Sequence, residues 1–272
     1  MCKISVIMGI YNMANKKEIM RLAIESILAQ TYKNFEFIIC DDGSSDRTYD
    51  LLKEFSKKDK RIILLKNDKN RGLAYSLNNC LKFARGKYIA RMDADDISMP
   101  NRLEKQLRFL EKNFEYALVG SNLLYINNKG IWGKRILPEY PNKKSFLFTS
   151  PFAHPTILIR KDVLNSLNGY KVEKITRRLE DYDLFMRLYT NDYKGYNMQE
   201  FLYQFREDND AFKRRAYKYR WDEVQVRYRG FKSLGLMPFA LPYVIKPLIV
   251  GLIPQKILSK IRGVLQKRKD YL

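Results

Sequence analysis

The sequence predicts an α/β protein whose central sheet is mostly parallel. Over the first 112 residues, short apolar runs typical of buried strands alternate with longer segments whose apolar residues recur at helical spacing. Acidic residues directly follow two of these runs, at Asp41-Asp42 and at Asp93-Ala94-Asp95-Asp96. Because ligands of open α/β sheets bind beyond the carboxyl ends of the strands, the same pattern indicates a candidate site.

The first half of the chain supplies four pairs of a strand and a helix. Its helical segments carry apolar residues on one face, as Met20, Ile24 and Ile27 do. Ser98 and Pro100 are typical of an N-cap and a first helical turn, so a helix is expected to start directly after the second acidic run. Strands are expected at residues 3–8, 35–40, 61–65 and 88–90, and helices at 18–30, 50–58, 73–84 and 100–112.

The second half departs from this alternation. A strand at 117–120 is followed by a hairpin over 123–136 that turns at Asn127-Asn128-Lys129-Gly130. A strand at 156–159, a helix at 161–167 and a helix that opens at Leu179 complete the pattern. We therefore predict a Rossmann-like sheet that becomes mixed, with an antiparallel portion, in the second half and that has helices on both faces.

Composition and charge limit the class of protein. The chain has 272 residues, of which 46% are hydrophobic, an ordinary value for a globular protein that argues against disorder. The net charge of +21 indicates a polyanionic partner, which is nucleic acid, an anionic membrane face or a phosphorylated substrate. Three cysteines without CxxC spacing favour a reducing, cytoplasmic compartment. We expect neither a signal peptide nor a transmembrane segment.

Basic residues are concentrated at the carboxyl end. Residues 213–272 contain 15 Lys and Arg against three Asp and Glu, an excess of 12 positive charges. The apolar stretch 236–253 is interrupted by three prolines and by Lys246, so it does not read as one spanning helix. Residues 256–268 place apolar and basic side chains on different faces of a predicted amphipathic helix.

The acidic run Asp93, Asp95 and Asp96 is the main chemical feature of the sequence. Three carboxylates at one strand end repel one another unless a cation joins them, and hard oxygen ligands suit Mg²⁺ or Mn²⁺. Such an ion would carry a substrate diphosphate, and the alternative is a solvated acidic turn. Gly9-Ile10-Tyr11-Asn12 lacks the glycine fingerprint of a dinucleotide site, and the sequence contains no P-loop.

Several motifs taken together resemble those of a known family. They are residues 4–12, Gln30-Thr31-Tyr32, residues 41–46, Asn70-Arg71-Gly72-Leu73, residues 93–96 and Glu180-Asp181-Tyr182-Asp183-Leu184. In order and spacing they resemble the inverting family 2 glycosyltransferases of the GT-A fold, over roughly residues 3–205. The resemblance implies an enzyme of the bacterial capsule, exopolysaccharide or lipopolysaccharide type.

The resemblance also implies roles for individual residues. The nucleotide site would consist of Gly9, Ile10, Tyr11, Asp42, Arg71, Asp93 and Ala94. A divalent Mn²⁺ or Mg²⁺ would be bound mainly by Asp95 with Asp93, and Asp181 would be the general base, with Glu180 as acceptor ligand or as the base in its place. His154 and Asp96 would lie on the acceptor side. The alternatives are a core aromatic at Tyr11, a solvated charge at Arg71 and a packing role at His154.

The reaction implied is a single in-line displacement that inverts the anomeric centre. The metal and Arg71 would neutralise the leaving nucleoside diphosphate while a carboxylate removes the proton of the acceptor hydroxyl. The donor is expected to be a nucleotide-sugar, a UDP-sugar by family frequency, with a hexosyl or N-acetylhexosaminyl group, and the acceptor a lipid-linked saccharide. Residues 171–178 are a candidate lid that excludes water.

The predicted organisation is a catalytic domain followed by a basic tail. Residues 1–212 would form the domain, with a nucleotide-sugar half at about 1–112 and an acceptor half at about 113–212, and residues 213–272 a helical tail. We expect this tail to bind an anionic membrane surface, placing the protein peripherally on the inner face of the cytoplasmic membrane. The alternative is a nucleic-acid-binding protein without transferase activity, although no nucleic acid is expected as a partner. A homo-oligomer is compatible with the sequence, which leaves the oligomeric state open.

Overall fold

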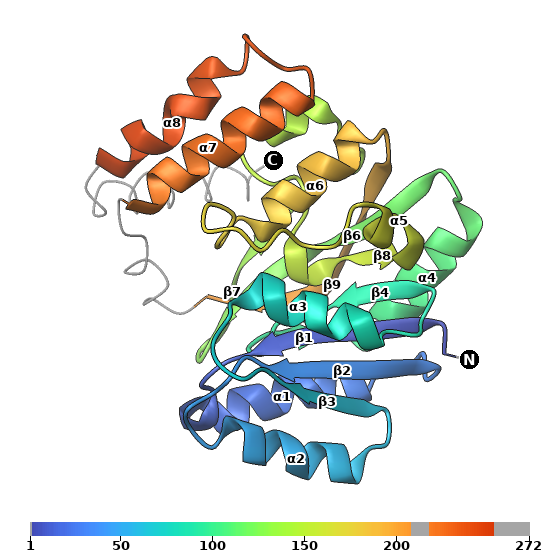
Figure 1. The fold of residues 1–272 in the computed structure, drawn as a ribbon. Coiled ribbons are helices and arrows are strands. Elements are labelled where there is room, and N and C mark those ends of the chain that lie inside the picture. The colour runs from blue at the N-terminus through green and yellow to red at the C-terminus, as the bar shows by residue number, and fades with distance from the viewer. Residues whose placement is uncertain (1, 208–217, 253–272) are drawn as a thin grey trace.

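The computed structural model describes residues 2–207 and 218–252 (Figure 1). In chain order the helices and strands are β1 (Ile4–Ile10), η1 (Ala14–Lys16), α1 (Lys17–Leu28), β2 (Phe35–Asp41), α2 (Thr48–Lys58), β3 (Ile62–Lys66), α3 (Leu73–Phe83), β4 (Tyr88–Arg91), β5 (Ile97–Ser98), α4 (Arg102–Lys112), β6 (Tyr116–Asn127), β7 (Gly130–Arg135), η2 (Lys143–Phe146), η3 (His154–Thr156), β8 (Leu158–Arg160), α5 (Lys161–Ser166), α6 (Glu180–Thr190), β9 (Lys194–Arg206), α7 (Lys218–Ser233) and α8 (Leu241–Leu252). The elements predicted for the first half are therefore present, with shifts of a few residues at their ends.

One mixed sheet forms the centre of the described residues. Its strands lie in the order β3-β2-β1-β4-β8-β6-β9-β5, and β7 pairs with β6 outside this path. β3, β2, β1 and β4 run parallel, whereas β8 is antiparallel to both β4 and β6. The predicted change from a parallel to a mixed sheet is confirmed.

Helices cover both faces of this sheet (Figure 1). Successive side chains of a strand point to opposite faces, so β1 places Val6 and Met8 in one core and Ile7 in the other. The first core is closed by α1, α2 and α4, and the second by α3, α5, α6 and α7. Burial on both faces explains why the strands of the first half read as nearly continuous apolar runs.

Two features of the second half differ from the prediction. The strand expected at 117–120 and the first strand of the hairpin are one continuous strand, β6, which turns into β7 at the predicted place. The 13-residue strand β9 was not predicted. It pairs with β6 through several register shifts, and it mixes polar with apolar residues, so its sequence shows no regular alternation.

The expected N-cap at Ser98 is wrong. Helix α4 begins at Arg102, and Ser98 lies in the short strand β5, opposite Tyr203 of β9. The Ser98 hydroxyl accepts a hydrogen bond from Gln30 Nε2 at 3.1 Å instead of capping the helix. Pairing with β9 holds this segment extended, and the local preference of serine for a cap is overridden.

The described part of the basic tail packs against the rest of the chain. Helix α7 contacts α6 and α8, and Val226 and Phe231 of α7 are buried in the second core. Within residues 2–207 and 218–252, no helix combines the length and the apolar character needed to cross a membrane. The predicted amphipathic helix at 256–268 lies outside the described residues.

Candidate active site

The carboxyl ends of three parallel strands meet at one edge of the sheet. Ile10 at the end of β1 pairs with Asp41 at the end of β2, and Ile7 of β1 pairs with Arg91 at the end of β4. The two acidic turns follow directly after β2 and β4. The parallel topology therefore brings together carboxylates that are far apart in the sequence, as the prediction requires.

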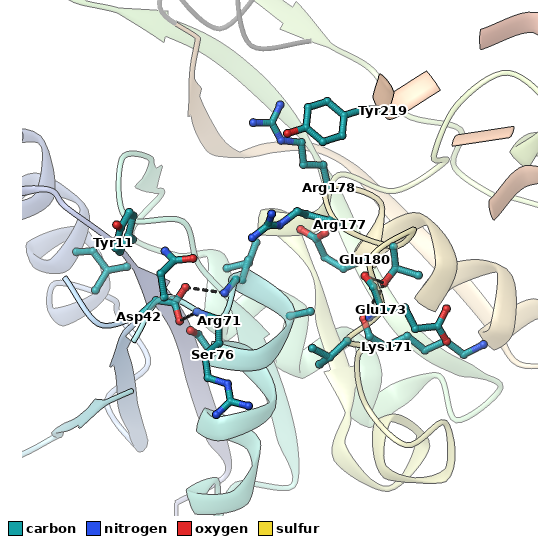
Figure 2. A pocket seen from close by; sticks show the side chains of 18 residues that line it. Tyr11, Asp42, Arg71, Ser76, Lys171, Glu173, Arg177, Arg178, Glu180 and Tyr219 are labelled. Atoms are coloured by element: carbon teal, nitrogen blue, oxygen red, sulfur yellow. Dashed lines mark hydrogen bonds between the residues drawn. The ribbon is translucent and has the colours of Figure 1, made fainter. Parts of the chain in front are cut away.

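A first cavity, of about 410 Å³, opens at this edge (Figure 2). One wall consists of the ends of β1 and β2 and the start of α3, and the other consists of the predicted lid, residues 171–178, with Glu180. Tyr11 is 45% exposed and lines the cavity, so it is not a core aromatic. The predicted nucleotide-binding residues that line this cavity are Gly9, Ile10, Tyr11, Asp42 and Arg71.

Asp42 holds the loop that precedes α3. Its Oδ1 accepts a hydrogen bond from the backbone N–H of Arg71 at 2.9 Å, and its Oδ2 accepts one from the backbone N–H of Gly72 at 2.8 Å (Figure 2). Oδ1 also accepts a hydrogen bond from Asn67 Nδ2 at 2.7 Å. A carboxylate has about four lone-pair sites. Asp42 therefore positions the loop and keeps capacity for a ligand hydroxyl.

Gly9 and Arg71 contribute in different ways. A Cβ atom on Gly9 would lie 3.0 Å from Leu73 Cδ1 and 3.2 Å from Ser76 Cβ, so glycine lets α3 approach β1, and position 9 offers a ligand only its backbone. The Arg71 guanidinium stacks on the ring of Tyr75 at 4.1 Å from the centroid. Stacking holds this cation on the cavity wall.

In the acidic turn after β4, burial and neighbouring negative charge disfavour the ionised state of a carboxyl group. Burial first, and then the charge of Asp93, raises the pKa of Asp95 to about 6. Asp93 is half-buried and forms an ion pair with Arg91. Asp96 Oδ2 has no hydrogen-bond partner within the described part of the chain. A divalent cation between Asp95 and Asp93 would relieve the repulsion between these two carboxylates, so this pair fits such an ion.

The protein alone supplies only part of a coordination shell. Among the residues that the structure describes, no three His, Cys, Asp or Glu side chains are placed to hold one metal together. Asp95 and Asp93 would be two carboxylate ligands, and a diphosphate and water would supply the others. This is the usual mode of Mg²⁺ binding in enzymes of phosphorylated substrates.

Two residues predicted to contact ligands point inward. Asp96 is 1% exposed, and its Oδ1 accepts a hydrogen bond from the backbone N–H of Arg206 at 2.7 Å. The expected acceptor contact at Asp96 is therefore not available, because this side chain attaches the turn to β9. Ala94 packs into the first core, which leaves only its backbone for a nucleotide.

A second cavity, of about 540 Å³, adjoins the first. The predicted site residues that line it are Asp93, His154, Glu180 and Asp181. Leu73, Arg178 and Glu180 line both cavities, so the two spaces meet at these side chains. Three segments distant in sequence therefore converge here, namely the acidic turn after β4, the η3 segment and the start of α6.

Glu180 and Asp181 occupy the first turn of α6, where the helix dipole favours negative charge. Burial, and next the charge of Asp181, raises the pKa of Glu180 to about 7. Burial also raises the pKa of Asp181. Both carboxyl groups therefore hold protons more readily than exposed ones, as is common for groups that act as acids or bases.

His154 is a buried, neutral residue. Its Nε2 lies 2.9 Å from the hydroxyl of Tyr170, and burial together with the charge of Arg91 lowers the pKa of His154 well below its ordinary value. A neutral imidazole can share a hydrogen bond with a ligand in the second cavity. It does not supply a positive charge to a departing phosphate.

Arg91 was given no role by the sequence analysis, yet it lies at the centre of the site. It is 2% exposed, and its Nε has no hydrogen-bond partner among the described residues. Burial raises the pKa of Asp95, Glu180 and Asp181, and the charge of Arg91 offsets part of that rise. An arginine directly before the acidic run was the only sequence signal for this role.

The chain is similar to known proteins over most of its length. Residues 5–167 match the family described as "Glycosyl transferase family 2". The chain is 44% identical over 259 residues to EpsE of Bacillus subtilis (strain 168), which is assigned as a glycosyltransferase, and the match covers 95% of this chain and 92% of that protein. It is 36% identical over 185 residues to the "UDP-Glc:alpha-D-GlcNAc-diphosphoundecaprenol beta-1,3-glucosyltransferase WfgD" of Escherichia coli, covering 68% and 69% of the two chains.

A solved structure shares the architecture. The mannosyltransferase PcManGT from Pyrobaculum calidifontis, in complex with GDP-Man and Mn²⁺, matches with a TM-score of 0.63 at 17% identity. The match covers 97% of this chain and 80% of that chain. At this level of identity the likeness concerns the fold.

Proposed function

The chain belongs to glycosyl transferase family 2 and has the GT-A fold, and we propose that it transfers a sugar from a nucleoside diphosphate donor to an acceptor hydroxyl with inversion. The observation that carries this proposal is the pair of adjoining cavities that meet at Glu180. A donor in the first cavity and an acceptor in the second would bring their reacting atoms together at that point.

The donor would lie along the ends of β1, β2 and β4. Its base and ribose would be held by Tyr11, Asp42 and the backbone at Gly9 and Ile10, and its diphosphate would extend toward the acidic turn. A bound Mn²⁺ or Mg²⁺ would neutralise the charge that develops on the leaving diphosphate. Asp95 with Asp93 would hold that ion, and the Mn²⁺ in the complex of the fold relative supports a divalent ion as cofactor.

Asp181 is our candidate for the general base. Both carboxyl groups at the start of α6 line the second cavity, but Glu180 also lines the first. In an inverting displacement the base acts on the acceptor, on the face of the sugar opposite the leaving group. Asp181 would therefore take the proton of the acceptor hydroxyl, and Glu180 would orient the acceptor.

The substrate class is proposed from the relatives. The Escherichia coli relative is named for a UDP-glucose donor and a saccharide linked to diphosphoundecaprenol. We propose a UDP-sugar donor of the hexosyl or N-acetylhexosaminyl type and a lipid-linked saccharide acceptor for this chain, in the synthesis of a cell-surface polysaccharide. The excess of 12 positive charges over residues 213–272 supports peripheral binding at the cytoplasmic face of a membrane.

The alternative of a nucleic-acid-binding protein without transferase activity is not supported. The family match and the relatives are those of a glycosyltransferase. An anionic lipid surface accounts for the charge of the basic tail and also for the amphipathic pattern predicted at residues 256–268, which nucleic-acid binding does not explain. The boundary placed at residue 212 between catalytic domain and tail stays a prediction.

A donor panel tests the proposed function. We expect full-length protein with Mn²⁺ to hydrolyse a UDP-sugar slowly, and to hydrolyse GDP- and dTDP-sugars more slowly, because water replaces a missing acceptor in the second cavity. Released nucleoside diphosphate is the measured quantity. If calorimetry detects no binding of any of these donors or of UDP, with or without Mn²⁺, the proposed function is wrong.

A further inference from the structure

A third cavity, of about 540 Å³, lies between α7, α8 and the loops at 148–149 and 177–179. Its charged lining residues are Arg177, Arg178, Arg220, Glu223, Arg227 and Lys246. Apart from Arg178, which has a further interaction of its own, four cations of the described lining face one carboxylate. The cavity adjoins the second cavity, because Arg178, Leu179 and Arg227 are among the residues that line both.

The single carboxylate leaves this cavity positively charged. Glu223 forms ion pairs with Arg220 at 3.2 Å and with Arg227 at 3.0 Å, so one acid serves two arginines. The Lys246 ammonium lies 5.3 Å from the ring centroid of Phe148, at the edge of the same space. Burial and the charge of Arg227 lower the pKa of Lys246. An anion bound here would offset that repulsion.

Helix α8 separates this cavity from an exposed apolar surface. Lys246, Pro247 and Val250 face the cavity. The apolar face of α8, by which we mean Leu241, Ile245, Ile249 and Leu252, is exposed, and its spacing of three and four residues places these side chains on one side of the helix. Phe239, just before α8, is 90% exposed. A basic cavity and an apolar surface therefore share one helix.

We propose that the third cavity binds the diphosphate group of a lipid-linked acceptor while the apolar face of α8 inserts into the membrane surface. This inference rests on the proposed function and adds a binding site for the carrier. The hydrocarbon chain would leave past α8, because an apolar chain and an apolar helix face both partition into the acyl region. The saccharide would extend past Arg178 and Leu179 into the second cavity, toward Asp181.

An ordinary anionic phospholipid fits this geometry less well. Its headgroup carries no saccharide to occupy the second cavity, whereas two adjoining cavities suit a headgroup that extends beyond its phosphates. A diphosphate also carries more negative charge than a phosphodiester, which matches the excess of cations. The two sources of phosphate can be distinguished by experiment.

Vesicle co-sedimentation of the full-length protein tests the proposal. Neutral phosphatidylcholine vesicles would contain either undecaprenyl diphosphate or an amount of phosphatidylglycerol that gives the same surface charge. We expect tighter binding to the diphosphate vesicles, and we expect inorganic pyrophosphate to compete with that binding. Lys246→Gln should lower the affinity for diphosphate vesicles about tenfold, because it removes a charge-assisted contact, and Lys246→Arg should restore it.

Lys232→Gln is the matched control. Lys232 is exposed on α7 and does not line the cavity, and its substitution by Gln removes the same single charge as Lys246→Gln. The proposal is wrong if both vesicle types bind equally well, or if Lys246→Gln and Lys232→Gln behave alike, since either result means general electrostatic attraction. Ile249→Ser should weaken binding to both vesicle types, and unchanged binding would refute insertion of α8.

A second measurement distinguishes failure of the third-cavity proposal from failure of the proposed function. Binding of UDP to the wild-type protein is measured on the same samples. If UDP binds but the preference for diphosphate vesicles is absent, only the third-cavity proposal fails. If the preference is present but no nucleotide binds, the transferase proposal fails.

Discussion

The first and second cavities adjoin each other but are built in different ways. The first is organised by hydrogen bonds, chiefly those that Asp42 accepts from the loop at 67–72. The second holds buried charges from distant segments, with Arg91 between the acidic turn and the start of α6. Hydrogen bonds therefore fix the wall of the first cavity, whereas the second contains carboxyl groups whose pKa is raised by burial, as is common where chemistry occurs.

The largest expected effect tests whether the proton of the acceptor hydroxyl is removed in the second cavity. Asp181→Asn should lower the rate of transfer about 10³-fold, because it replaces the proposed general base with an amide of similar size that cannot take the proton. The dissociation constant for UDP should stay the same, since Asp181 does not line the first cavity. Initial rates with a lipid-linked acceptor and calorimetry with UDP measure the two quantities.

Glu180→Gln serves as the comparison for this variant. If Asp181→Asn retains transfer and Glu180→Gln loses it, the two residues have the opposite roles. If Asp181→Asn weakens UDP binding as strongly as it lowers the rate, the assignment of donor binding to the first cavity and of proton transfer to the second is wrong.

An intermediate effect tests whether the acidic turn belongs to the donor side. Asp95→Asn removes a charged ligand at nearly constant volume, so Mn²⁺ should no longer strengthen UDP binding. The affinity for UDP in the presence of Mn²⁺ should therefore fall about tenfold or more. Calorimetric titrations with and without Mn²⁺ give the value. Asp50→Asn, a matched change on the exposed side of α2, should keep the full Mn²⁺ effect. A folded Asp95→Asn protein with wild-type metal dependence would place the ion elsewhere.

The smallest expected effect tests whether ionised Glu180 in the second cavity lowers the free energy of unfolding. Burial raises the pKa of Glu180 to about 7, above an ordinary value of about 4.3. The folded state therefore binds this proton more tightly than the unfolded state, and the stability that the proton provides is lost as the pH rises from about 4.3 through 7. Glu180→Gln should raise the free energy of unfolding at pH 8, on the order of 1–3 kcal/mol, with a smaller gain at pH 5.

Urea unfolding at the two pH values measures this difference. Glu54→Gln on the exposed surface of α2 is the control, and its effect should not depend on pH in this way. Equal gains at pH 5 and pH 8 for Glu180→Gln would show that ionised Glu180 is not destabilising.

Much of the fold and part of the site follow from local sequence. The apolar runs and helical spacing of the first half predict strands β1 to β4 and helices α1 to α4 within a few residues, because burial on both faces of a parallel sheet leaves a strong pattern. The ends of β2 and β4 also place Asp42 and Asp93 at one edge of the sheet, since parallel strands align their carboxyl ends. The family motifs then single out Glu180 and Asp181, which line the same cavity as Asp93.

Only the tertiary structure decides which of these residues face a ligand and in which charge state. Pairing with β9 turns Asp96 inward and makes Ser98 part of a strand, although both have sequence signals for other roles. Likewise Arg91 becomes the buried centre of the site and His154 becomes neutral. The physical reason is that burial and electrostatic potential at a side chain are sums over neighbours from distant parts of the chain, which no local pattern encodes.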